Sequence, residues 1–357
     1  MSAAALETPF PLQPGQVTVD WLTRRLRAGG ALTSGAVTAV AIESNRLWNV
    51  AQTARLTLTF SADADPGAPA RLFVKIRTQV DPYAHLFPGE YAFYRQTRGE
   101  GLPLAPCFDA LCDATTGATC ILLADLGASH RVEPWPLPPA VPMCAAAVTA
   151  LAQLHAHWWT CDDPVDGQTR ETLVAREDIT ADAVAGLLPG FFDVLGDRLP
   201  AERRALIATV GERLPALRKA RLAPGTPLTR LHGDAHWWNI LYPRDLARDG
   251  CIWLDWEDWR HDFGAGDLAH LIALHWYPDR RARHEDNLLA TYHSALLGAG
   301  ITGYDRNDLD ADYRLGHLGN LVIPVFQQEM NSPHQSWWSH LERWFMAFED
   351  LDCRALL

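Results

Sequence analysis

The hydrophobic pattern of this chain changes about a third of the way along, and this change limits the possible folds more than any other feature. In the first third, apolar and β-branched residues alternate or form short runs between turn-rich stretches, which is typical of strands. We predict strands at 37–42, 54–60, 72–76 and 119–123, and a helix that begins near Pro88. Further along the chain, the apolar residues mostly recur at helical spacing. The pattern therefore predicts an α+β fold with a β-rich first part and a larger, mainly helical second part.

The segment between these two parts is rich in proline. Its sequence, EPWPLPPAVP at 133–142, cannot continue a helix or a central strand, because proline lacks the backbone N–H that both structures need. We interpret it as a connector. We divide the chain into an N-terminal, β-rich lobe at 1–125 and a C-terminal lobe at 126–357.

Composition excludes several classes of protein. The chain of 357 residues is 48% hydrophobic and 21% charged, as in a globular domain, and it has no run of about 18 apolar residues that would predict a membrane span. Seven scattered cysteines without zinc-ligand spacing, and a start without a basic and apolar leader, favour the cytoplasm. The net charge of −12 argues against a nucleic-acid partner, because phosphates would be repelled. It suits a neutral or cationic small substrate and leaves the oligomeric state open.

One short region carries residues suited to phosphoryl transfer. The segment LHGDAHWWNILY places Asp234 and Asn239 five residues apart in a loop, and the apolar strand of CIWLDWED ends in Asp255. A carboxylate can orient an acceptor hydroxyl and take its proton, while Mg²⁺ prefers amide and carboxylate oxygens as ligands. Any one of these residues alone would be interpreted as a turn or capping residue. Their order and spacing together predict a kinase site.

In these motifs the sequence resembles the aminoglycoside phosphotransferase and choline kinase superfamily, whose members share the protein-kinase fold. The catalytic loop of that superfamily, HGDxxxxN, is matched at 232–239, and its metal-binding IDWE-like run is matched at 254–257. The similarity extends over about residues 35 to 300. It implies an enzyme that transfers phosphate from ATP, with Mg²⁺, to a small molecule.

The resemblance also assigns roles to individual residues. It implies that Asp234 is the catalytic base, that Asn239 and Asp255 bind Mg²⁺, and that His232 braces the loop. In the downstream segment GAGDLAHLI, we expect Asp267 to be a helix N-cap.

A second aspartate competes with Asp255 for the metal role. Asp262, Phe263 and Gly264 spell the metal-binding motif of protein kinases, but they lie in the charged stretch WEDWRHDFG. No apolar strand leads into Asp262, whereas one leads into Asp255. We therefore assign the metal site to Asp255.

The nucleotide side of the site is expected in the first lobe. Lys75 lies amid apolar residues of a predicted strand and resembles the kinase lysine that holds the α- and β-phosphates of ATP. Glu90, at the start of the predicted helix, is then its ion-pair partner, with Glu100 as the alternative. The simpler interpretation is an edge-strand lysine that faces water.

Two further segments resemble nucleotide-binding elements of kinases. ILLADLG at 121–127 resembles the hinge between lobes, which implies that backbone groups of Asp125 and Leu126 bind adenine. ESNRLWN at 43–49 lies where a glycine-rich phosphate-binding turn is expected, yet it contains no glycine. We expect Ser44 and Asn45 to contact the phosphates instead.

The acceptor is expected to be a compact organic molecule with a hydroxyl group. His236 and Trp237 lie inside the catalytic loop, and Glu257 and Asp258 follow the metal-binding aspartate. We predict that these four residues contact the acceptor, since an aromatic ring beside carboxylates suits a cation or a sugar ring.

Other functions remain possible on the sequence. A catalytically inactive, kinase-fold binding or regulatory protein is the main alternative, although it would not need all four of Lys75, Asp234, Asn239 and Asp255. A protein kinase is disfavoured by the HGD loop. A metallohydrolase built on the HxDxH pattern at 232–236 would leave Lys75 unexplained.

Overall fold

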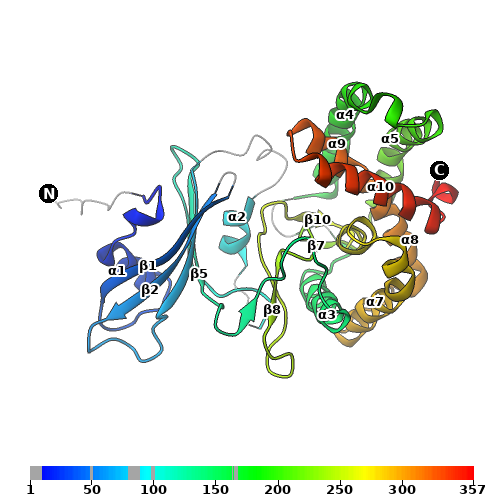
Figure 1. Ribbon diagram of the computed structural model, residues 1–357. Coiled ribbons are helices and arrows are strands. Elements are labelled where there is room, and N and C mark those ends of the chain that lie inside the picture. Colours follow the sequence, from blue (N-terminus) through cyan, green and yellow to red (C-terminus); the bar gives the residue numbers. More distant parts are fainter. Residues whose placement is uncertain (1–9, 49–50, 79–88, 98–100, 163, 165–167) are drawn as a thin grey trace. The chain divides into compact units, whose positions relative to one another are not determined.

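A five-stranded antiparallel sheet forms the centre of the first part of the chain in the computed structural model (Figure 1). Its order is β1-β2-β3-β5-β4. The strands are β1 (Val37–Trp48), β2 (Ala51–Phe60), β3 (Arg71–Arg77), β4 (Cys107–Cys112) and β5 (Thr119–Ala124). All four predicted strands are therefore confirmed, whereas β4 was not predicted.

Two helices cover opposite faces of this sheet (Figure 1). Helix α1 (Val19–Ala28) packs Leu22 and Leu26 against one face, in a core shared with Val74 and Ile76. Side chains alternate between the faces of a strand, so Lys75 lies on the other face, with helix α2 (Gly89–Gln96). This alternation brings a lysine from a buried strand to a helix that begins with a carboxylate.

The chain divides into two units. The first contains residues 1–131 and 243–245, and the second contains 132–242 and 246–357. The division thus falls a few residues beyond the predicted end of the N-terminal lobe. The structure describes residues 10–48, 51–78, 89–97, 101–162, 164 and 168–357.

The second unit is mainly helical. Its helices are α3 (Val141–His157), α4 (Arg170–Leu195), α5 (Ala201–Arg221), α6 (Ala265–Leu268), α7 (Pro278–Gly298), α8 (Arg306–Gly319), α9 (Val322–Glu329) and α10 (His334–Asp350). A π-helical turn, Ala269–Leu274, continues α6. Short 3₁₀ turns lie at Pro14–Gln16, Gly196–Arg198 and Cys353–Leu356.

Helix α4 is long and apolar enough to cross a membrane by length and composition alone. It begins with a capping box, in which Thr169 and Thr172 satisfy each other's backbone N–H groups. Leu173 packs in a buried cluster with Leu222 and Leu228, and α4 also contacts α5 and α9. Helix α4 therefore packs against the helical unit along part of its surface.

Short strands carry the loops on which the candidate site is built. Strand β7 (Thr229–Leu231) pairs with β10 (Arg260–Asp262), and β8 (Ile240–Pro243) pairs with β9 (Ile252–Trp253), both antiparallel. A further short strand, β6, is His130–Arg131. The segment 232–239 therefore runs between two strand ends and is held at both.

Candidate active site

The loop between β7 and β8 is fixed by His232. The ring of His232 is fully buried, its Nδ1 accepts a bond from the backbone N of Asp234 at 3.3 Å, and its Nε2 donates to the Leu254 carbonyl at 2.7 Å. Burial lowers the pKa of His232, so the ring is neutral and holds a single proton on Nε2. This is the geometry expected of a residue that braces the loop against the segment after β9.

Gly233 is required by the path of this loop. Its φ of 87° lies in the left-handed region, and a Cβ there would meet the Asp258 carbonyl oxygen at 2.0 Å. Only glycine allows the backbone at 232–234 to pass this close to the segment that follows β9.

Asp267 holds the same loop from α6. Its carboxylate accepts the backbone N–H groups of His232, at 2.6 Å, and Gly233, at 3.0 Å, and lies 3.3 Å from Nε2 of His155. The prediction that Asp267 is an N-cap is wrong: Gly264 occupies the N-cap of α6, and the Asp267 carboxylate binds the loop rather than its own helix.

The Asp234 carboxylate is accessible and charged. Its side chain is 42% exposed, and three side-chain nitrogens surround it: Asn239 Nδ2 at 3.3 Å, and the Nε2 atoms of His236 and His270, each at 3.5 Å. Burial on its own would raise the pKa of Asp234, but His236, His270, His232 and the hydrogen bond from Asn239 together outweigh it, and the pKa is lowered. At neutral pH the group is a carboxylate that can accept a hydroxyl proton.

Asn239 is oriented by its amide nitrogen. That nitrogen donates to the backbone carbonyl of Asp234 at 3.1 Å as well as to its carboxylate, which leaves the Asn239 Oδ1 as the atom suited to a cation. The Asn239 carbonyl also accepts from the backbone N of Leu254 at 2.9 Å, and Ile240 pairs with Trp253. This pairing brings the residue after Leu254, Asp255, to the same end of the β8–β9 hairpin as Asn239.

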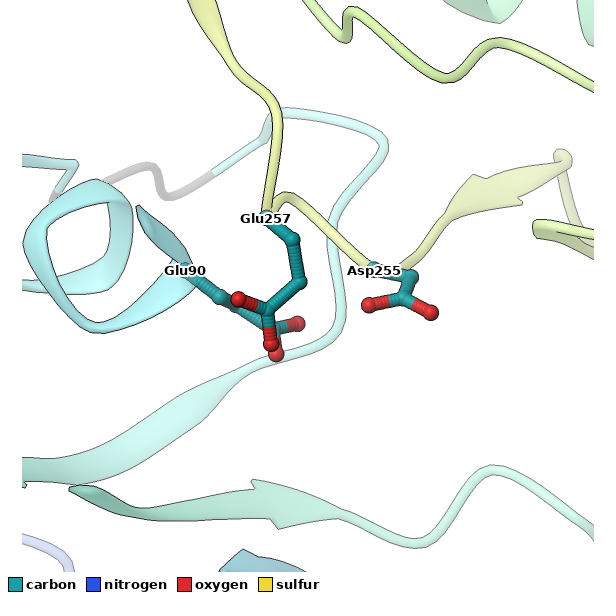
Figure 2. Close-up of side chains that lie close together, drawn as sticks. All are labelled: Glu90, Asp255 and Glu257. Carbon is teal, nitrogen blue, oxygen red and sulfur yellow. The ribbon is translucent and has the colours of Figure 1, made fainter. Parts of the chain in front are cut away.

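Asp255 and Glu257 project from the loop after β9 (Figure 2). Asp255 has a φ of 65°, a conformation that non-glycine residues adopt rarely and often at functional sites. Carboxylate and amide oxygens are what Mg²⁺ prefers as ligands, and the Asn239 Oδ1 adds an amide oxygen to this set. The donor groups therefore fit the predicted magnesium site.

The competing aspartate, Asp262, is occupied by arginines. It is 1% exposed, bonds to Arg218, and lies 3.6 Å from Arg176. Burial would raise its pKa, but these guanidinium groups lower it. Arg218 also binds Glu177 at 2.6 Å, so Asp262 belongs to a buried ion-pair network. This arrangement favours Asp255 as the metal-binding residue.

In the first unit, Lys75 and Glu90 form an ion pair. Lys75 Nζ lies 2.6 Å from Glu90 Oε2, and the two side chains are 14% and 3% exposed. The water-facing alternative for Lys75 is therefore wrong. Glu100 lies outside the described residues.

The hinge-like segment at 121–127 contains two backbone groups that could bind adenine. Asp125 N donates to the Arg71 carbonyl, and the Leu126 carbonyl accepts from Ser129 and His130; among the described residues, the Asp125 carbonyl and the Leu126 N–H have no backbone partner. The Asp125 side chain is fixed by Arg71 at 3.2 Å. Binding of adenine here stays a prediction.

The structure has a strand where the phosphate-binding turn was predicted. Ser44 and Asn45 lie inside β1, where they pair with Arg55 and Ala54 of β2, because the two strands extend further than their β-branched runs indicate. A turn at 43–48 is therefore wrong, and residues 49–50 between the strands lie outside the described residues. A phosphate contact by Ser44 or Asn45 stays a prediction.

The structure contradicts the prediction that Trp237 contacts the acceptor. The Trp237 ring is fully buried and stacks on Trp276, with ring centroids 5.2 Å apart, so it is part of the core. Its neighbour Trp238 is partly exposed, and its ring lies 5.9 Å from that of His236.

The other predicted acceptor residues remain accessible. Glu257 and Asp258 are partly exposed. Burial, with the nearby charge of Asp234, raises the pKa of Asp258 to about 7. Their contact with the acceptor stays a prediction.

His270 was missed from the sequence. It follows Asp267 by three residues, so both project from one side of the same helical segment towards the catalytic loop. That spacing was the available signal, but it had meaning only once Asp267 was known to face the loop.

Comparisons with known proteins identify the family and the fold of this chain. A profile described as "Phosphotransferase enzyme family" matches residues 57–306, more than half of the chain. The chain belongs to this family. A search of curated proteins finds no match.

Solved structures similar to this phosphotransferase include the choline kinase LicA from Streptococcus pneumoniae, with 12% identity, a TM-score of 0.51, and coverage of 88% of this chain and 94% of that one. A glucosamine kinase gives 15% identity, a TM-score of 0.51, and coverage of 90% and 96%. At such identities the likeness concerns the fold, which is the α+β, protein-kinase-like fold expected from the sequence.

Proposed function

We propose that this phosphotransferase moves the γ-phosphate of ATP, with Mg²⁺, to a hydroxyl group of a compact organic molecule. The observation that carries the proposal is the Asp234 carboxylate, which is ionised, 42% exposed, and bonded to an asparagine whose carbonyl oxygen is left for a cation. A catalytic aspartate and a metal-binding asparagine five residues apart are what phosphoryl transfer to a hydroxyl needs.

Each residue has a defined part in this reaction. Asp234 orients the acceptor hydroxyl and accepts its proton, while Asn239 and Asp255 supply oxygen ligands for Mg²⁺. Bound Mg²⁺ would neutralise negative charge on the phosphates. Lys75, oriented by Glu90, supplies a cation for the α- and β-phosphates.

The acceptor class follows from charge. With a net charge of −12 the protein would repel a polyanion, and the carboxylates of Asp234 and Glu257 add to this near the reaction centre. We therefore propose a neutral or cationic hydroxylated small molecule as acceptor, rather than a nucleic acid.

The test is a screen for acceptor-dependent conversion of MgATP to ADP with sugars, amino alcohols, nucleosides and aminoglycosides. Asp234→Asn should lower kcat by roughly 100-fold or more, because it removes the proton acceptor, while MgATP binding measured by calorimetry is kept. Tight MgATP binding without turnover of any acceptor would support the inactive binding protein instead. Normal turnover in Asp234→Asn would remove this residue from the base role.

A further inference from the structure

Both oxygens of the catalytic carboxylate face a histidine. Nε2 of His236, in the catalytic loop, lies 3.5 Å from Oδ2 of Asp234, and Nε2 of His270 lies 3.5 Å from Oδ1. The two rings approach from separate segments of the chain, so they hold the carboxylate from different directions. Asn239 adds a third contact, to Oδ2.

The contacts of each ring indicate which of its nitrogens carries a proton. The backbone N–H of Trp238 donates to Nδ1 of His236, so this nitrogen accepts and the ring proton is on Nε2, towards Asp234. Burial lowers the pKa of His270 to about 4, so its ring is neutral, and a proton on Nε2 would face the ionised carboxylate of Asp234, 3.5 Å away. Both imidazoles therefore direct an N–H towards Asp234.

The position of His270 depends on an unusual piece of backbone. It lies in the π-helical turn Ala269–Leu274, a conformation that is rare and frequent at functional sites. Nδ1 of His275 donates to the His270 carbonyl at 2.7 Å, and the His275 ring packs 5.8 Å from His236 and 5.0 Å from His340. The hydrogen bond from His275 thus fixes the backbone of His270, whose side chain contacts Asp234.

A metal-binding role does not account for this histidine cluster. In the part of the chain that the structure describes, the one group of three potential ligand atoms within 4.8 Å of one another contains no histidine. The shared feature of His236 and His270 is their contact with Asp234.

We propose that His270 is a positioning residue for the catalytic base: with His236 it fixes the plane of the Asp234 carboxylate, so that its exposed side meets the acceptor hydroxyl. This inference rests on the proposed function. Its physical basis is that an aspartate carboxylate turns about a soft terminal torsion, and a contact on each oxygen removes that freedom. A misplacement of about 1 Å can cost roughly 100-fold in rate.

The kinetic test uses MgATP hydrolysis, with water as the acceptor, in three variants. His270→Leu removes the N–H and should lower kcat by roughly 10- to 100-fold, with the KM for MgATP changed less than about twofold. His270→Gln places an amide N–H near the position of Nε2 and should recover most of the loss. His317→Leu is the matched control: His317 is an equally buried, neutral histidine that bonds to the Trp344 carbonyl. It should keep wild-type kcat below its melting temperature.

A kcat unchanged in His270→Leu would overturn the proposal. An equal loss in the Leu and Gln variants, both normally folded by thermal melting, would show that His270 only fills space.

A second measurement does not depend on turnover. Nitrogen-15 NMR of the histidine rings should show a protonated Nε2 and an unprotonated Nδ1 for His236 and His270, and Asp234→Ala should shift both sets of signals while leaving His317 unchanged. A proton on Nδ1 of His270 would overturn the proposal. If the wild-type protein hydrolyses no MgATP and phosphorylates no acceptor, the proposed function fails, whereas the NMR result still decides the contact.

Discussion

Replacing each of the two competing aspartates, Asp255 and Asp262, by asparagine should affect turnover and stability in opposite ways. Asp255→Asn should abolish Mg²⁺-dependent turnover and leave stability nearly unchanged, because asparagine tolerates the left-handed backbone of this position well. Asp262→Asn should do the reverse: it keeps the shape of the side chain but removes a buried charge that Arg218 and Arg176 need.

The size of the Asp262 effect follows from its surroundings. Removing one partner of a buried ion pair costs about 3–5 kcal/mol. Because Arg218 keeps its 2.6 Å contact with Glu177, we expect the lower end, about 3 kcal/mol. For a unit of this size that is a drop in Tm of roughly 6–12 °C.

The assay combines thermal melting with a Mg²⁺ titration of turnover, made below the Tm of both variants. Asp262→Asn should melt early and still show a normal Mg²⁺ dependence. Loss of Mg²⁺ dependence in Asp262→Asn at an unchanged Tm, with Asp255→Asn active, would refute the assignment.

Three further predictions concern other parts of the structure. Lys75→Ala should raise the KM for MgATP, and Glu90→Gln should do so more mildly, because the lysine keeps its charge and loses its orientation; nucleotide titrations with no change in either variant would exclude this pair from the site. Trp237→Ala should lower the free energy of urea unfolding by about 3–5 kcal/mol and leave the acceptor KM unchanged. A raised acceptor KM at unchanged stability would show that Trp237 contacts the acceptor. In metal-free buffer, the raised pKa of Asp258, about 7, means that the folded state holds this proton more tightly than the unfolded state. Stability should therefore fall as the pH rises from about 4 through 7, and Asp258→Asn should melt above wild type at pH 8, by an amount that shrinks as the pH is lowered; equal melting curves at pH 8 would contradict it.

The sequence was sufficient to predict those parts of the fold and the site that depend on local contacts or on a periodic pattern. Alternation of apolar residues predicted the strands of the sheet, including the strand that carries Lys75. The sequence placed Asp234 and Asn239 five residues apart on one short loop, and in the structure the two side chains are joined by a hydrogen bond.

What failed depended on tertiary contacts. Trp237 and Trp238 are identical neighbours, and only packing against Trp276 decides which of them is buried. The roles of Asp267 and His270 were hidden for a related reason: both act on a loop that is distant in the sequence. No spacing rule within their own helix indicates what they touch.

The hydrogen bonds between Asp267 and the catalytic loop have a consequence for how the protein unfolds. Because one buried carboxylate holds the amides of His232 and Gly233 and also contacts His155 of α3, these amides cannot open to solvent unless α6 separates from the loop. Their hydrogen exchange should therefore proceed only through unfolding of the whole helical unit, rather than through local fraying. The catalytic loop would then be among the last segments of this unit to lose protection, so a folded helical unit keeps a formed catalytic loop.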